Sequence, residues 1–196
     1  MAIGILLIVV AALWRVAGAF VPGGAFSNFA PLMALALCGG LFLPRVWAWV
    51  IPLAALLISD FILDLHYGVP FLTWMGGSVY ACYAVTIMAG IGLRRNPRLP
   101  LVFGAALLSS LLFYVVTDTV AWAADPGYAK DAAGWFQALT TGLPGYPPTW
   151  TFFRNSAASD LLFTGLYIGA MALTGSRLAG AESLPAGRMV RVAVRS

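Results

Sequence analysis

The sequence is dominated by long apolar runs, separated by short polar breaks that carry glycine, proline or arginine. A helix needs about 20 apolar residues to cross the hydrocarbon core of a bilayer. Because 61% of the 196 residues are hydrophobic and only 9% are charged, the ionic groups are too few to coat a water-facing surface. We therefore predict an all-α membrane protein, a bundle of six transmembrane helices. Six runs reach or approach the required length, and they cover residues 2–20, 26–43, 46–65, 72–93, 99–123 and 157–176.

Basic residues are distributed unevenly over the breaks. If six helices alternate in direction, the loops and ends of one side hold only Lys130 and Arg154. Basic residues in short loops stay on the cytoplasmic side, so both termini are predicted to be cytoplasmic, with residues 1–176 as a single transmembrane domain and 177–196 as a polar cytoplasmic tail. A cleaved signal peptide over the first run is the competing interpretation, although the run lacks a basic n-region. The arginine-rich side holds Arg45, Arg94, Arg95, Arg98, Arg177, Arg188, Arg191 and Arg195.

The longest connection, residues 124–156, is rich in glycine, proline and aromatic residues. Trp135, Phe136 and Leu139 lie at near-helical spacing among polar residues, which predicts a short helix at the membrane surface. Residues 142–148 predict a tight turn. Irregular segments of this length are usually functional or disordered. Two interpretations stay open, a partly ordered loop that acts as a lid over a pocket or a solvated linker with an aromatic anchor.

Five charged residues fall inside the apolar runs. At a rise of about 1.5 Å per residue, Asp60 lies about 9 Å below the outer interface, and the others lie in the same leaflet. An ionised carboxylate in the bilayer costs roughly 2.5 to 3.5 kcal/mol on insertion scales, so these side chains are expected to face the bundle interior. Either they line an outward-facing, partly wet pocket, or they pair with each other and hold helices together. The five are Arg15, Asp60, Asp64, Asp118 and Asp160.

In the pocket interpretation, polar side chains near the outer helix ends join the aspartates. Trp74, Trp122 and Tyr80 form the apolar walls of this pocket. Loops near Asn28, Tyr67 and Trp150 form its roof. No serine-histidine couple, zinc motif or phosphate-cradling loop is present, so an intramembrane enzyme ranks last and no catalytic residue is predicted. Nucleic-acid binding is excluded because the arginines flank apolar runs and form no basic stripe. The predicted ligand-binding residues are Asn28, Asp60, Asp64, Tyr67, Trp74, Asp118, Trp122, Arg154, Asn155 and Asp160.

Two features of the sequence resemble metal sites, a run of three polar residues at the end of the third apolar run and a single cysteine in the fourth. Asp60, Asp64 and His66 resemble a metal-ligand run, but a continuous helix places His66 roughly 200° around the axis from Asp64. Cys82 is placed mid-membrane, where a buried thiol is usually a small hydrophobe and soft-metal ligation is the alternative. No resident metal or cofactor is therefore expected.

Three segments carry a resemblance to a known family. They are NFAP at 28–31, PLAALLISD at 52–60, and FRNS at 153–156 followed by SDLL at 159–162. Over roughly residues 26–173 the chain resembles an uncharacterised family of six-helix bacterial transport proteins, which is similar to the S-components of energy-coupling-factor (ECF) vitamin transporters. The resemblance implies a substrate-binding protein of the bacterial inner membrane. Its pocket would open to the periplasmic side and take up a small micronutrient such as a vitamin or precursor.

The resemblance also bears on partners. Besides the lipid bilayer and the small-molecule substrate, it implies an ECF coupling subunit and ATPases. S-components commonly dock through an Ala-xxx-Ala face on the first helix, and this first run has none, so the use of such a module stays open. Some solitary S-component-like proteins import cobalamin through a cysteine ligand, which makes corrinoid uptake with Cys82 as the cobalt ligand an alternative. A structural or assembly subunit of a larger membrane complex is the alternative from another class.

Overall fold

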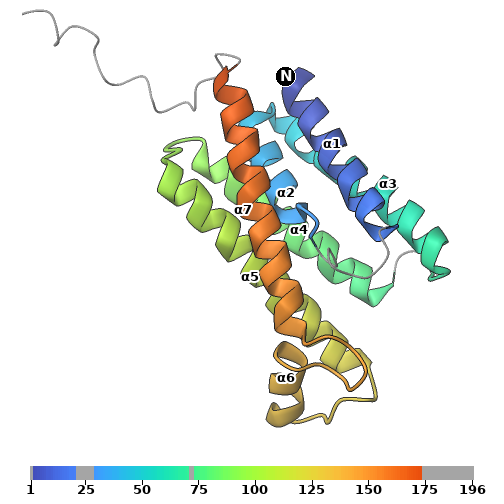
Figure 1. Cartoon of the computed structure of the whole chain (residues 1–196). Helices are drawn as coiled ribbons and strands as arrows, with labels where there is room; N and C mark the ends of the chain where they lie inside the picture. The colour runs from blue at the N-terminus through green and yellow to red at the C-terminus, as the bar shows by residue number, and fades with distance from the viewer. Residues whose placement is uncertain (1, 21–28, 71–72, 174–196) are drawn as a thin grey trace, which may run out of the picture.

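The computed structural model describes residues 2–20, 29–70 and 73–173, and the regular structure in these residues is helical (Figure 1). Five of the helices are long and apolar enough to cross a membrane, which confirms an all-α, multi-pass membrane protein. The helices are α1 (Ala2–Ala19), α2 (Leu32–Phe42), α3 (Arg45–Tyr67), α4 (Trp74–Leu93), α5 (Leu99–Ala124), α6 (Ala132–Leu139) and α7 (Thr149–Leu173).

The second predicted span requires correction, because α2 has only 11 residues. At about 1.5 Å per residue it is roughly 16 Å long, about half the thickness of the hydrocarbon core. Nine of its residues are buried, and it packs against all five membrane-spanning helices. The apolar side chains that led to the prediction of a sixth span are therefore buried by other helices at the centre of the bundle.

Close backbone contacts hold α2 in this central position. A Cβ atom built on Gly40 would come within 2.4 Å of the Ile87 carbonyl oxygen on α4, and one on Gly90 would come within 2.3 Å of the Leu37 carbonyl oxygen on α2. Small residues let helix backbones approach in this way, which is a common packing device between membrane helices. Hence α2 and α4 cross with their backbones in contact at Gly40 and Gly90.

Helix α7 begins at Thr149, eight residues before the predicted start at residue 157. Trp150, Arg154 and Asn155 therefore lie on a helix and not in a loop, which corrects the predicted roof over the pocket. Tyr67 was also expected near a loop, but it is the last residue of α3, which ends at Gly68 with φ of 65°. The short helix expected around Trp135 is confirmed as α6.

The two ends of the bundle differ in character. The start of α1 and the end of α7 lie at one end in Figure 1, and α6 lies at the other. Arg45 opens α3, and Arg94 and Arg95 follow α4 on the way to α5, so the described loop arginines lie at the end that also carries the two termini of the bundle. The predicted tail at 177–196 lies outside the described residues. We call the end of the bundle that carries Arg45, Arg94 and Arg95 the arginine end.

Candidate functional site

The carboxylate of Asp160 caps the first turn of α2. Asp160 lies on α7 and is only 1% exposed. Its Oδ1 accepts a hydrogen bond from the Ala34 backbone N–H at 2.9 Å, and its Oδ2 accepts one from the Ser110 hydroxyl at 2.6 Å. Pro31 precedes α2 and supplies no side-chain cap, so the acceptor for the buried Ala34 N–H comes from another helix. Asp160, predicted to bind a ligand, is thus occupied by contacts within the protein.

Arg94 serves the opposite end of α2. Its Nε donates to the Gly40 carbonyl oxygen at 2.6 Å and its Nη2 donates to the Leu43 carbonyl oxygen at 2.5 Å. Burial lowers the pKa of Arg94, and the nearby charge of Arg45 lowers it further. A helix N-terminus favours negative charge and a C-terminus favours positive charge. The buried half-length helix therefore has an acidic partner at its start and a basic partner at its end.

An ion pair joins α1 to α3. Arg15 Nη2 lies 2.6 Å from Asp60 Oδ1, and both side chains are 15% exposed. Arg15 Nη1 also donates to the Ser59 hydroxyl at 2.6 Å, and that hydroxyl donates to the Leu56 carbonyl oxygen. Charge pairing between helices was one of the two sequence interpretations, and it is observed at this pair.

Two tyrosines of α4 place hydroxyl groups next to these charges. The Tyr83 side chain is fully buried, and its hydroxyl lies within electrostatic range of Arg15, Asp60 and Asp160. The Tyr80 hydroxyl lies beside Asp60. Within the part of the chain that the structure describes, neither hydroxyl has a partner at full hydrogen-bonding geometry, and the Tyr80 hydroxyl interacts more loosely with the Asp60 carboxylate. We define Arg15, Asp60, Tyr80 and Tyr83 as the internal polar layer.

The unpartnered hydroxyls are the chemically distinctive part of this layer. Leaving a buried hydroxyl without a partner costs about 1 to 3 kcal/mol, and such groups in native proteins call for an explanation. In a low-dielectric interior, a donor that lies beside charges binds an acceptor more strongly than it does in water. Tyr80 and Tyr83 are therefore suited to hold an acceptor group of a solute next to Arg15.

The predicted residues near the end of α3 lie at the rim of the layer. Asp64 is half-buried and also lies within electrostatic range of Tyr80, whereas Tyr67 is exposed. The His66 ring contacts Phe20, with ring centroids 4.3 Å apart, because α3 continues through this residue. Asp60 and Asp64 thus act on a common neighbour, as their spacing predicted, and His66 is engaged in aromatic packing.

Other predicted residues lie on a separate part of the molecule, formed by the end of α5, α6 and the start of α7 (Figure 1). Trp122 Nε1 donates to the Ala129 carbonyl oxygen at 2.7 Å, which fixes the loop after α5. Arg154 hydrogen-bonds the Asn155 side chain at 3.3 Å and lies 5.4 Å from the centre of the Trp150 ring. In the described residues α3 has no close approach to α5 or α7, so these side chains do not join Asp60.

Asp118 on α5 belongs to this separate part. It is partly buried and lies within electrostatic range of Tyr114 and Tyr128. Burial raises the pKa of Tyr128 in the following loop, and the charges of Asp118 and Asp125 raise it further. The pocket predicted from the sequence is consequently divided. Asp60 belongs to the internal polar layer and Asp64 lies at its rim, whereas Asp160 caps α2 and Asp118 lies on the separate part of the molecule.

Asn28, Trp74 and Cys82 are the predicted residues that remain. Asn28 lies outside the described residues, and Trp74 is the first residue of α4. The Cys82 side chain is buried. Across residues 2–20, 29–70 and 73–173, no group of three or more His, Cys, Asp or Glu side chains is placed to hold a metal ion.

A protein-family model matches residues 1–184, and its description is a family of unknown function, DUF6580. The chain belongs to this family. The match includes all five membrane-spanning helices, both partners that cap α2 and the internal polar layer. No curated protein and no solved structure matches the chain. The function must therefore be argued from the site itself.

Sequence reasoning missed Tyr83 and treated Tyr80 as an apolar wall. Their spacing could have indicated that the two hydroxyls lie close together, because residues three apart on a helix occupy neighbouring positions of one face. Ser59, which orients Arg15, directly precedes Asp60 in the sequence. The partners of Asp160 gave no such signal, because they lie on two other helices.

Proposed function

We propose that the protein is a membrane-embedded binding protein for a small polar solute, and that the solute binds in the internal polar layer. The observation that carries the proposal is the pair of buried Tyr80 and Tyr83 hydroxyls, which lie beside the Arg15–Asp60 ion pair without a partner at full hydrogen-bonding geometry among the described residues. Polar and ionisable groups inside a membrane bundle are costly, and they commonly mark a substrate path. The solute would present an oxygen or nitrogen acceptor to the two hydroxyls.

As predicted from the sequence, the proposed role is the uptake of a micronutrient such as a vitamin or precursor, in the manner of an ECF S-component. The residues proposed to bind the solute differ from those predicted. Arg15, Asp60, Tyr80 and Tyr83 supply the polar contacts, and Asp64 lies at the rim. Asp64 is near the end of α3 that lies away from the arginine end. Entry from that side agrees with a periplasmic opening if the arginine end faces the cytoplasm.

The test compares two tyrosine variants by native mass spectrometry of the full chain purified from its host membranes. Wild type is expected to carry a small molecule of defined mass, and Tyr83→Phe is expected to lose it while remaining folded. Tyr167→Phe is the matched control, because the Tyr167 hydroxyl donates to the Gly4 carbonyl oxygen at 3.1 Å and lies outside the internal polar layer. That variant is expected to retain the small molecule.

Two results would contradict the proposal. One is wild-type protein that carries no bound small molecule when purified in a mild detergent. The other is Tyr83→Phe protein that retains the ligand as fully as wild type. Removing an unsatisfied buried hydroxyl is expected to leave stability unchanged or slightly higher, so loss of the ligand from this variant would not reflect unfolding.

A structural or assembly subunit is the second candidate, and a specific observation favours it. The ion pair of Asp60 and the helix cap of Asp160 account for two of the intramembrane carboxylates without any ligand. In this case the protein would co-purify with a stable membrane complex that is not a transporter, and Tyr83→Phe would change nothing. Recovery of an ECF coupling subunit and ATPases in the same experiment would instead support uptake through that module.

A further inference from the structure

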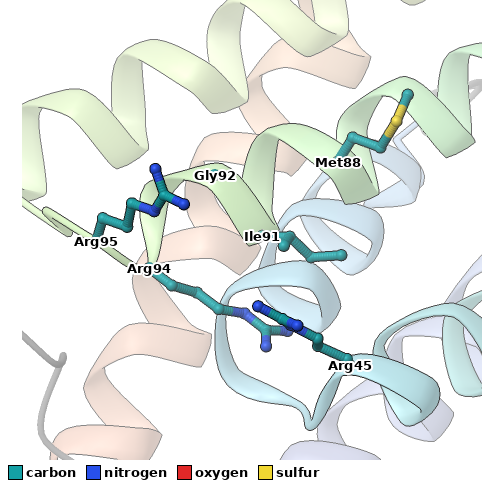
Figure 2. Close-up of a pocket in the computed structure, with 6 residues that line it drawn as sticks. All are labelled: Arg45, Met88, Ile91, Gly92, Arg94 and Arg95. Atoms are coloured by element: carbon teal, nitrogen blue, oxygen red, sulfur yellow. The ribbon is translucent and has the colours of Figure 1, made fainter.

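A cavity of about 440 Å³ lies at the arginine end, between the start of α3 and the end of α4. Figure 2 shows the guanidinium groups of Arg45 and Arg94 close together, and Arg95 also lines the cavity, with its side chain apart from this pair. Because this cavity is at the opposite end of α3 from Asp64, it is separate from the internal polar layer. Its lining residues are Arg45, Met88, Ile91, Gly92, Arg94 and Arg95.

The cavity carries uncompensated positive charge. Two nitrogens of Arg94 are held by the carbonyl oxygens at the end of α2, which fixes its guanidinium in place. Over the described ranges, neither Arg45 nor Arg95 forms an ion pair with a carboxylate. The closeness of Arg45 and Arg94 is itself unfavourable, because like charges repel. An anion between these side chains would relieve that repulsion.

The backbone adds donors at the same place. Helix α3 begins at Arg45 after Pro44, and no side chain caps its first turn. The first N–H groups of a helix have no partner within the helix and favour an anion, above all one with several acceptor oxygens such as a phosphate. Arginine side chains suit the same group because their planar fork of donors matches phosphate oxygens.

The other wall of the cavity is apolar. Met88 and Ile91 lie one helical turn apart on α4, and Met88 is 52% exposed. On a membrane-spanning helix such an exposed side chain faces lipid. A ligand that fits both walls carries a phosphate at one end and a hydrocarbon chain at the other. We infer that this cavity binds an anionic phospholipid, with its phosphate at the three lining arginines and its acyl chain along Met88 and Ile91.

The experiment uses the full chain purified in detergent, with lipid binding followed by native mass spectrometry. Phosphatidylglycerol is titrated against phosphatidylcholine, and inorganic phosphate is added in a separate arm with thermal denaturation as the readout. The test variant is Arg45→Gln combined with Arg95→Gln. Arg94 is left in place because it caps α2. Arg98→Gln is the matched control, because Arg98 lies at the same end of the bundle but does not line the cavity.

Wild type is expected to prefer phosphatidylglycerol over phosphatidylcholine. In the double variant, the ratio of the two lipid affinities is expected to fall roughly thirtyfold, because two basic residues near an anionic headgroup are removed. Arg98→Gln should change the preference by less than about threefold. The inference is overturned if wild type binds both lipids equally, or if Arg98→Gln causes the same loss as the double variant. Stabilisation by inorganic phosphate without any preference among lipids would also overturn it.

Discussion

Replacement of Asp160 by alanine is expected to lower the free energy of unfolding by about 2 to 4 kcal/mol, because two hydrogen bonds to its buried carboxyl group are lost. The variant leaves the Ala34 N–H without its acceptor in the interior of the bundle, whereas the Ser110 hydroxyl still has the Ala106 carbonyl oxygen as an acceptor. An unsatisfied buried N–H costs about 1 to 3 kcal/mol, and the loss of the hydrogen bond from Ser110 adds about 1 kcal/mol. The destabilised element should be α2, because Asp160 caps its first turn.

Asparagine at the same position is the matched control. Its side-chain oxygen can accept from the Ala34 N–H, and its amide can donate to the Ser110 oxygen, because the Ser110 hydroxyl has a second acceptor in the Ala106 carbonyl oxygen at 3.0 Å. Asp160→Asn is therefore expected to cost no more than about 2 kcal/mol, chiefly through loss of the favourable charge at the helix N-terminus.

The assay is denaturant titration of the three proteins in the same detergent, followed by circular dichroism and checked by size-exclusion chromatography. Wild type should unfold last, Asp160→Asn next and Asp160→Ala first. Equal stability of Asp160→Ala and wild type would refute the capping role. Equal destabilisation by asparagine and alanine would refute the hydrogen-bond argument in particular.

Three further predictions concern packing and charge. Gly90→Ala should lower stability by about 1 to 3 kcal/mol in thermal denaturation, because its Cβ would meet the α2 backbone, whereas Gly104→Ala, which has open space, should be neutral or stabilising. A double-mutant cycle on Arg15 and Asp60 should give a coupling energy of about 1 kcal/mol or more, and additive effects would contradict the ion pair. Arg94→Gln should lower stability by about 1 to 3 kcal/mol through lost bonds to two carbonyl oxygens, measured by the same denaturant titration; no change would argue against its capping role.

The lengths of the apolar runs predicted most of the membrane helices well. The ends of α3, α4 and α5 differ from the predicted boundaries by at most two residues. Proline and glycine at the breaks, together with flanking arginines, explain this agreement, because each disfavours continuation of an apolar helix. The start of α7 was missed since the polar residues at 149–156 resemble a loop in composition, although they form a regular helix.

The short α2 was beyond prediction for a different reason. An apolar segment buried by other helices and one that faces lipid have the same hydropathy, so composition alone does not distinguish them. The candidate site was predicted only in part for a related reason. Depth along a helix follows from residue counting, but the neighbour of a side chain depends on which helices pack together. Asp60 and Asp118 were thus placed at similar depth, although they lie on helices that do not touch.

The cap on α2 also constrains how the chain assembles. Ala34 and Asp160 are 126 residues apart in sequence, and they lie on helices that leave the ribosome far apart in time. During synthesis the first turn of α2 has no carboxylate partner until α7 enters the membrane. Helix α7 therefore completes the packing around α2 only after the other described membrane helices have been synthesised.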